Sequence, residues 1–398
     1  MNAIPSPAST ASRIDWVDVA KAVGITLVFY GHLVEHFVRW NAPAAADHMK
    51  WVYSFHIPVF FVLLGFIYKD RDISVGAFLI RQIRTRLVPA WAFNIVCMLA
   101  WIRSEFLQPD FGHIGDHGWL SLLRYCATET LPMFVLGEAR WNIVTWFLFC
   151  LFTVELWQFF LRPLLRNNTR LVVSIVGFGV LAVLVDSYAH PIHNLLGAKR
   201  HWWYITSGVG AMVFYQLGIL MRRLGWLVSR QGRLRCAVLG ALCLAITLVT
   251  FDLNQAVADN ELNRALGHNA MPVVFLISAK YGELWWFALT SLAGSFFVIY
   301  VSQVLSGSRV LKYIGQITLA LMCLDGVFHN EVNYYFARWI VRMLPGLNAW
   351  LFTGICVLAT ALSIAICVPI ILILDKYLPF VLGRRAPRPA TTAGADKA

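Results

Sequence analysis

The chain has 398 residues, of which 59% are hydrophobic and 14% are charged, and its mean hydropathy is +0.65. About a quarter of the residues of an ordinary soluble domain are charged, so this composition excludes a soluble globular protein and predicts a polytopic membrane protein. The net charge of +12 does not predict nucleic-acid binding, because basic loops beside anionic lipid headgroups explain it in a membrane protein.

Apolar segments long enough to cross a bilayer, at about 20 residues each, recur along the whole chain. The ten that we identify are 19–39, 51–68, 87–104, 141–161, 170–188, 203–221, 235–252, 283–304, 310–328 and 350–375. All are predicted to be helices, because hydrocarbon offers their backbone groups no other local hydrogen-bond partners. Two shorter apolar stretches, 129–136 and 270–278, are predicted to be re-entrant or interfacial. The sequence therefore predicts an all-α fold.

The distribution of lysine and arginine predicts which ends of these helices face the cytoplasm. With the N-terminus placed inside, 22 of the 33 basic residues fall in the inside segments. Because cytoplasmic loops are enriched in these residues, both termini are predicted to be cytoplasmic. Residues 15–380 are predicted to form one transmembrane domain, with disordered tails at 1–14 and 381–398. No internal repeat is visible, which argues against a transporter built from duplicated halves.

The first segment carries ionisable residues where a membrane helix rarely has them. His32 follows Lys21 by eleven residues, which is about 16 Å of helix and places His32 at or beyond mid-membrane if Lys21 lies at the cytoplasmic surface. Glu35 and His36 follow on the same helix face, where a carboxylate could orient the His32 imidazole or raise its basicity. Such buried ionisable groups often mark function. A structural histidine, satisfied by an interhelical hydrogen bond, is the alternative.

The second segment carries a histidine at a similar depth. His56 lies about five residues from the outer end of this helix, so an antiparallel neighbour would bring it level with His32. Pro58 follows at once and could open the hydrogen-bond ladder beside a site. The alternative interpretation is an interfacial histidine.

A basic cluster, Arg81, Arg84 and Arg86, lies at the inner edge of the third segment. Arginine forks bind phosphate bidentately, and Arg81 and Arg84 could share one helix face. Topogenic charge in contact with lipid phosphates is the alternative.

Taken together, these features suit a donor that docks its phosphates on the arginines and extends a long thin arm to a histidine in mid-membrane. A histidine there could take a proton from a hydroxyl, and coenzyme A thioesters have the required shape.

Three stretches carry a resemblance to a known family: DWVDVAKAVGITLVFYGH (15–32), SFHIPVFFVLLGF (54–66) and FLIRQIRTRLVPAW (78–91). Their order resembles the acyltransferase 3 family of integral membrane O-acyltransferases, and most closely its fucose 4-O-acetylase-like branch. Weaker similarities at 146–156, 211–223 and 311–329 extend the resemblance over most of the chain.

The resemblance implies about ten membrane helices and transfer of an acyl group, usually acetyl, from cytoplasmic acyl-CoA to sugar hydroxyls. The acceptors in this family are often cell-surface polysaccharides or their lipid-linked precursors. The candidate catalytic base of the family falls on His32. The other matching positions are Lys21, His56, Pro58, Arg81, Arg84 and Arg86. The chain departs from the family pattern late in the sequence, where Asp325 stands at a position that usually holds histidine, and His329 follows one turn later.

We therefore predict an acyltransferase of the bacterial inner membrane that O-acetylates a surface glycan or its lipid-linked precursor, with acetyl-CoA as co-substrate. His32 is the predicted general base, Glu35 its orienting carboxylate, and His56 either aligns the acceptor hydroxyl or polarises the thioester. The predicted phosphate ligands are Lys21, Arg81, Arg84 and Arg86. Predicted partners are acyl-CoA, the glycan acceptor, membrane lipids and polysaccharide-assembly proteins, with no nucleic acid.

The same membrane-embedded residues allow an alternative function. A flippase for polyprenyl-linked saccharides is the alternative function, in which the buried histidines would couple transport to protons. No metal site is predicted, because the histidines of the outer loops have irregular spacing. These histidines are His113, His117, His190, His193 and His201.

Overall fold

The computed structural model describes residues 14–107, 118–195, 202–228, 231–255 and 272–384. Of the two predicted tails, only residues 14 and 381–384 belong to this described part. Within it the chain is helical, and its only β-type pairing is an isolated bridge between Phe275 and Lys280. The predicted all-α fold class is thereby confirmed.

The α-helices of the described part follow one another along the chain. In the first half they are α1 (Asp15–Val38), α2 (Ala45–Tyr53), α3 (His56–Phe66), α4 (Val75–Gln82), α5 (Val88–Leu107), α6 (Gly118–Val135), α7 (Trp146–Leu161) and α8 (Asn168–Leu195). In the second half they are α9 (Ile205–Arg223), α10 (Arg233–Thr250), α12 (Leu284–Val304), α13 (Arg309–Gln316), α14 (Thr318–Phe328), α15 (Tyr334–Met343) and α16 (Ala349–Tyr377). Short 3₁₀ turns lie at Ile143–Thr145, Leu276–Ser278 and Pro379–Leu382, and π-helical turns lie at Ile83–Leu87 and His329–Asn333.

Eight helical segments of the described part are long and apolar enough to cross a membrane, and they lie at eight of the predicted positions. They are Asp15–Val38, Ala45–Phe66, Val75–Ser104, Ile143–Leu161, Asn168–Asp186, Arg233–Thr250, Leu284–Val304 and Ala349–Tyr377. The segment predicted at 310–328 is a broken span, because helices Arg309–Gln316 and Thr318–Met343 are bent by 75°. α9 lies at the remaining position and is less apolar than the eight. The protein is therefore a multi-pass membrane protein.

The two short apolar stretches take different forms. Residues 129–135 are the last turns of the helix α6, whereas the described residues of 270–278 form an irregular segment with a 3₁₀ turn at Leu276–Ser278. Val274, Phe275 and Leu276 of this segment are buried. It is part of the protein interior rather than a loop at the surface.

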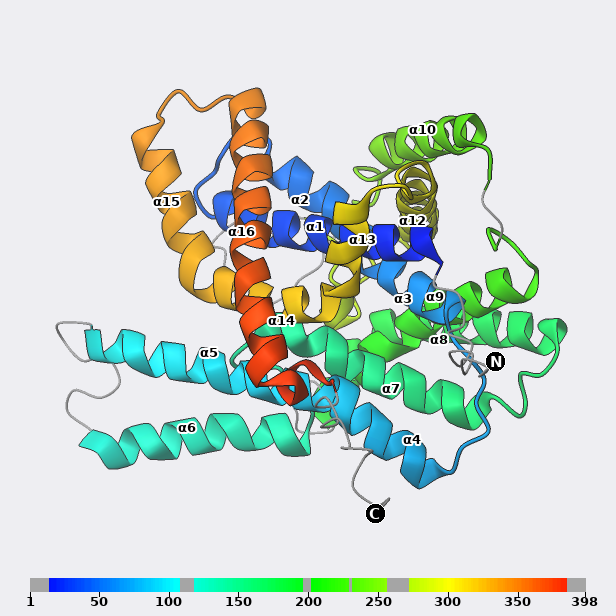
Figure 1. The fold of residues 1–398 in the computed structure, drawn as a ribbon, viewed down its shortest axis with the longest axis horizontal. Coiled ribbons are helices and arrows are strands. Elements are labelled where there is room, and N and C mark those ends of the chain that lie inside the picture. Colours follow the sequence, from blue (N-terminus) through cyan, green and yellow to red (C-terminus); the bar gives the residue numbers. More distant parts are fainter. Residues whose placement is uncertain (1–13, 108–117, 196–201, 229–230, 256–271, 385–398) are drawn as a thin grey trace, which may run out of the picture.

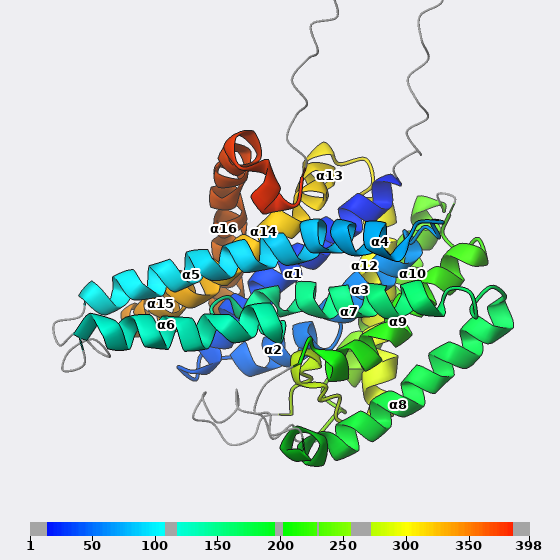
Figure 2. The ribbon, with the colours of Figure 1, turned by 90° about the horizontal axis from the view of Figure 1, so that it is seen from below.

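α1 runs through the centre of the molecule (Figures 1 and 2). It contacts α2, α3, α12, α13, α14, α15 and α16, so most of its surface meets protein. Glu35 and His36 are each only 4% exposed. Glu35 and His36 therefore point into the protein, as expected of polar groups that would be costly in lipid.

α3 is held against α9 by close contact between the two backbones. A Cβ atom at Gly65 would collide with the carbonyl of Tyr215, and one at Gly218 would collide with the carbonyl of Val62. Only glycine allows such an approach, which fixes α3 and the histidine at its start. α5, α6 and α7 lie next to one another below α1 in Figure 1.

Candidate active site

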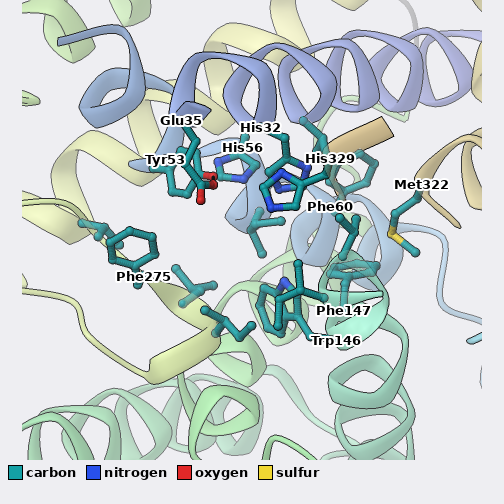
Figure 3. Close-up of a pocket in the computed structure, with 17 residues that line it drawn as sticks. His32, Glu35, Tyr53, His56, Phe60, Trp146, Phe147, Phe275, Met322 and His329 are labelled. Carbon is teal, nitrogen blue, oxygen red and sulfur yellow. Dashed lines mark hydrogen bonds between the residues drawn. The ribbon is translucent and has the colours of Figure 1, made fainter. Parts of the chain in front are cut away.

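A cavity of about 130 Å³ lies beside α1 at the level of His32 (Figure 3). We call it the histidine cavity. Its ionisable and hydroxyl side chains are His32, Glu35, Tyr53, His56 and His329, from α1, α2, α3 and the π-helical turn after α14. Aromatic and aliphatic side chains close its other side, among them Phe60, Trp146, Phe147, Phe275 and Met322. The structure thus brings the predicted residues His32, Glu35 and His56 together.

His32 is held by a carboxylate from the distant part of the chain. Its Nδ1 lies 2.5 Å from Oδ2 of Asp325, whose side chain is fully buried. An ionised carboxylate only accepts hydrogen bonds, so Nδ1 of His32 carries a proton and donates it, and in the neutral ring Nε2 then keeps its lone pair. His32 consequently offers a proton acceptor to the cavity that its side chain lines.

The position of Asp325 follows from the way α14 is packed. A Cβ at Gly326 would collide with the side chain of Asn142, so glycine is needed at this close contact. The Asn142 amide in turn donates to the carbonyl of Cys323 over 2.9 Å. These contacts hold α14 at the point where Asp325 meets α1. Asp325, whose role the sequence left open, is the hydrogen-bonded partner of His32.

His56 is oriented by a break between α2 and α3. Pro58 has no N–H to donate to the preceding turn. The regular α-helical hydrogen bonds stop at the end of α2, at Tyr53, and resume at the start of α3, at His56. Nδ1 of His56 donates instead to the carbonyl of Val52 over 2.8 Å. Because a carbonyl only accepts, the lone pair of His56 is on Nε2. The predicted opening of the ladder beside the site is present.

Glu35 has a different partner from the one that the sequence suggested. Its Oε2 accepts a hydrogen bond from the hydroxyl of Tyr53 over 2.6 Å. The hydrogen bond to His32 comes from Asp325, so Glu35 acts on the His32 ring only through space. Gly31 makes the Tyr53 contact feasible, because a Cβ there would lie 3.2 Å from the Tyr53 ring.

Two further histidines continue the cluster. Nε2 of His36 lies 3.2 Å from Nδ1 of His329, and the ring centroids of these residues are 4.6 Å apart. The His329 ring also lies 5.1 Å from that of His32. Nδ1 of His36 is buried and has no hydrogen-bond partner among the described residues.

A second cavity, of about 530 Å³, collects basic side chains around the start of α1. We call it the basic cavity. It is lined by Lys21, Lys69, Arg71, Arg81, Arg86 and Arg222, together with Asp18, Tyr68 and Glu155. Burial and the nearby Asp70 carboxylate raise the pKa of Tyr68 to about 12, so its hydroxyl keeps the proton and can donate to an anion. Of the predicted phosphate ligands, Lys21, Arg81 and Arg86 meet here.

Arg84 does not line the basic cavity. Its Nε is buried without a hydrogen-bond partner among the described residues, and it belongs to the π-helical turn Ile83–Leu87. In a π-helix the chain advances by about five residues between hydrogen-bonded groups. This geometry brings Arg86 rather than Arg84 beneath Arg81.

Arg86 is fixed by a fork of hydrogen bonds to Glu155. Its Nε and Nη2 donate to the two carboxylate oxygens over 3.1 and 2.9 Å. The Arg86 side chain is 18% exposed and that of Glu155 9%. A bidentate pair in this environment orients the guanidinium. Lys21 in turn lies 3.5 Å from the Asp18 carboxylate, which lines the same cavity.

Replacing Glu155 with alanine is expected to lower the stability of the protein by up to about 3 kcal/mol, because a largely buried arginine loses its partner. The midpoint of thermal unfolding in detergent, followed by tryptophan fluorescence, measures this loss. Asp15→Ala is the control, since Asp15 is 60% exposed and pairs with Lys312 at the surface. Its expected cost is below about 1 kcal/mol. Equal losses of stability in the two variants would show that the Arg86–Glu155 pair stabilises the protein no more than the surface pair of Asp15 and Lys312.

The two cavities lie along the same faces of α1 and α3. On α1 the lining residues run from Lys21 in the basic cavity to Val28 and His32 in the histidine cavity. Between them Gly24 meets Phe60, whose ring would lie 2.9 Å from a Cβ at position 24. The contact between Gly24 and Phe60 thus lies between the two sets of lining residues on α1.

The described residues contain no group of three or more histidine, cysteine, aspartate or glutamate side chains that could hold a metal ion. The side chains of His113, His117, His190, His193 and His201 lie outside the described part of the chain. Of the clustered histidines, His32 is paired with Asp325, His36 with His329, and His56 with the carbonyl of Val52.

Comparison with known proteins gives two findings. A family model described as "Acyltransferase domain" matches residues 14–368. The chain is also similar to "Nodulation protein NolL" of Mesorhizobium japonicum, with 24% identity over 224 residues. That similarity covers 54% of this chain and 53% of the relative, so the chain spans about half the length of the curated relative that it matches. No solved structure matches the chain significantly.

Proposed function

The chain belongs to the acyltransferase 3 family and is a multi-pass membrane acyltransferase, and we propose that it transfers an acetyl group from cytoplasmic acetyl-CoA to a hydroxyl of a sugar. The proposed acceptor is a cell-surface or exported polysaccharide or its lipid-linked precursor, and the proposed location is the bacterial inner membrane. Acyl-CoA, the glycan, membrane lipids and polysaccharide-assembly proteins are the proposed partners. The fucose 4-O-acetylase-like branch remains a prediction from sequence.

One observation supports this proposal: His32, hydrogen-bonded to the buried Asp325 carboxylate, lines a cavity that lies on the same helix faces as the basic cavity. His32 has the Asp325 carboxylate within 2.5 Å, which would stabilise the imidazolium that forms when Nε2 takes a proton. Lys21 lies eleven residues away on α1, about 16 Å along the helix, a reach that suits the pantetheine arm of coenzyme A.

The chemistry that we assign is direct transfer between a hydroxyl and a thioester. Nε2 of His32 takes the proton of the acceptor hydroxyl as its oxygen attacks the thioester carbon. When the tetrahedral intermediate collapses, the carbon–sulfur bond breaks and the His32 imidazolium returns the proton to the leaving thiolate. The products are the sugar ester and free coenzyme A, and the histidine is neutral again.

His56 fits one of its two predicted roles better than the other. Its only N–H is committed to the carbonyl of Val52, so the neutral ring has a lone pair but no proton to offer the cavity. It can accept a hydrogen bond from the acceptor hydroxyl and align it. A neutral His56 cannot donate to the thioester oxygen, so we assign it the aligning role.

The basic cavity is the proposed site for the phosphates of coenzyme A. Arg81 and Lys21 supply positive charge there, and Lys69, Arg71 and Arg222, which the sequence analysis did not single out, line the same space. Arg86 is oriented by Glu155 and presents its remaining N–H groups. Charge-assisted hydrogen bonds from several cations would give affinity for a polyphosphate.

Arg81→Ala is expected to weaken acetyl-CoA binding about tenfold, because one charge-assisted contact to phosphate is worth about 1.5 kcal/mol or more. The matched control is Arg84→Ala, which removes an arginine three residues away that does not line the cavity. Equilibrium binding of radiolabelled acetyl-CoA to detergent-purified protein measures both. A larger loss of affinity in Arg84→Ala than in Arg81→Ala would contradict the assignment of the basic cavity as the phosphate site. Absence of saturable acetyl-CoA binding in the wild type would favour a flippase.

The function itself is tested on the glycan. Mass spectrometry of surface polysaccharide from a deletion strain should show the loss of O-acetyl groups, restored by the wild-type gene. Purified protein in vesicles, with labelled acetyl-CoA and the deacetylated glycan, should transfer the label. A deletion strain with unchanged O-acetylation would overturn the proposed acceptor.

A further inference from the structure

The role of His329 is not explained by acid–base chemistry at His32. This residue lines the histidine cavity from the π-helical turn His329–Asn333, and its ring packs against the rings of both His32 and His36. Its Nδ1 is engaged by Nε2 of His36 at 3.2 Å. Nε2 is therefore the ring nitrogen of His329 that can interact with a molecule in the cavity.

The tautomer of the pair follows from the other nitrogen of His36. Nδ1 of His36 is buried and has no partner among the described residues. If that atom carried the proton, a buried N–H would be left without an acceptor, which proteins rarely tolerate, whereas a bare lone pair is tolerated more often. The proton of His36 thus belongs on Nε2, from which it is donated to Nδ1 of His329. A neutral His329 then carries its own proton on Nε2.

The other ionisable and hydroxyl side chains of the cavity have already used their protons. Tyr53 donates to Glu35, His32 donates to Asp325, and His56 donates to the carbonyl of Val52. The carboxylate of Glu35 can only accept. Trp146 retains an indole N–H with no hydrogen bond among the described residues, on the side of the cavity opposite α1. His329 is therefore the donor on the side of the cavity that holds the proposed base.

We propose that His329 is a catalytic hydrogen-bond donor to the carbonyl oxygen of the acyl donor, and that His36 is the positioning residue that fixes its tautomer. This inference rests on the proposed acyl transfer. The cavity then has two complementary halves, in which His32 and His56 present lone pairs and His329 presents an N–H. A nucleophilic attack on a carbonyl needs both kinds of group.

The donated proton does not leave His329 during the reaction. As the acceptor oxygen bonds to the thioester carbon, His32 takes the hydroxyl proton and the carbonyl oxygen becomes an oxyanion. The N–H of His329 hydrogen-bonds this oxyanion, more strongly than it bonds the ground-state carbonyl. When the carbon–sulfur bond breaks, the oxygen returns its electrons to the carbonyl, and the thiolate takes the proton from His32.

The test compares matched variants at each position. His329→Gln keeps an N–H at a similar reach, whereas His329→Met has a similar volume without one. Because the interaction strengthens in the transition state, His329→Met should lower kcat about 10²- to 10³-fold with little change in KM for acetyl-CoA. His329→Gln should retain clearly more activity than His329→Met. Equal activity of His329→Met and the wild type overturns the inference.

His36 is tested in the same way, with a readout that does not depend on turnover. His36→Met removes the donor to Nδ1 and should lower kcat, whereas His36→Gln can still donate and should lose less. Solid-state NMR of ¹⁵N-histidine-labelled wild-type protein in vesicles should find His329 protonated on Nε2 and bare on Nδ1, with the signals assigned by the His36→Gln and His329→Gln variants. A bare Nε2 overturns the inference whatever the kinetics show.

The outcomes separate this inference from the proposed function. A wild-type protein that transfers no acetyl group in vesicles overturns the proposed function, and the role of His329 at a carbonyl falls with it. A wild type that transfers acetyl while His329→Met transfers it equally fast overturns only the present inference. Unchanged thermal unfolding midpoints are required of each variant that is compared.

Discussion

His32→Asn is expected to lower kcat for acetyl transfer by about 10³- to 10⁴-fold, the upper part of the range for the loss of a general base. Asparagine is chosen because its amide nitrogen lies near the place of Nδ1 and can still donate to Asp325. The variant therefore removes the proton acceptor at Nε2 without leaving the buried carboxylate unpaired, which alone could unfold the protein. Label transfer from acetyl-CoA to glycan, in vesicles, measures the effect.

A second histidine gives the control for this substitution. His48 bonds the hydroxyl of Tyr30 over 2.6 Å and does not line the histidine cavity. His48→Asn should keep kcat within about threefold of the wild type, since less than about 1 kcal/mol of transition-state stabilisation is involved. If His32→Asn inserts, binds acetyl-CoA normally and transfers acetyl at the wild-type rate, His32 is not the base.

Much of the fold was predictable because hydrocarbon imposes one simple rule on sequence. A span must be apolar and helical, so hydropathy alone located the eight segments that the structure confirms.

The break near Ile317 was not predictable in the same way. The segment 310–328 was read as one helix although it carries Lys312 and Gln316, and the chain bends by 75° there. Beside the bend Gly315 packs against the backbone of Asp18, a contact between distant parts of the chain that hydropathy does not show.

The parts of the site that lie on one helix were also predictable. Helical spacing predicts the relative positions of Lys21, His32 and Glu35 on α1. Pro58 indicates the break between α2 and α3 that orients His56. Asp325 could not be assigned, because it is 293 residues from His32 and only the folded chain shows that they meet. The sequence showed it as a departure from the family pattern. A buried carboxylate at a position that usually holds histidine was a signal that a neighbouring cation or imidazole should be sought.

The arginine cluster shows how a small change in helix type alters a site. On an α-helix Arg81 and Arg84 share a face, which motivated their pairing as phosphate ligands. The π-helical turn Ile83–Leu87 changes the spacing to about five residues. Arg86 therefore joins Arg81 in the basic cavity, and Arg84 does not. The second π-helical turn, His329–Asn333, likewise carries a residue of the histidine cavity.

Asp325→Asn is expected to lower kcat by about 10⁴-fold while the KM for acetyl-CoA stays nearly constant, as for the aspartate of a Ser-His-Asp triad. The substitution keeps the size and shape of the side chain, so α14 should pack as before. It changes the direction of the hydrogen bond, because the new amide can donate to Nδ1 of His32. The imidazole would then carry its proton on Nε2 and could not accept one from the acceptor hydroxyl.

The distribution of the loss between kcat and KM separates this role from a structural one. Asp325 does not line the basic cavity, so a direct catalytic effect leaves acetyl-CoA binding intact. A misfolded variant would lose binding, kcat and thermal stability together. Asp325→Asn with normal binding, a normal unfolding midpoint and wild-type kcat would contradict the assignment.

Glu35 is hydrogen-bonded to Tyr53 rather than to His32. Glu35→Gln should therefore lower kcat far less than Asp325→Asn, and the ratio of the two losses in kcat identifies the carboxylate that acts on the base.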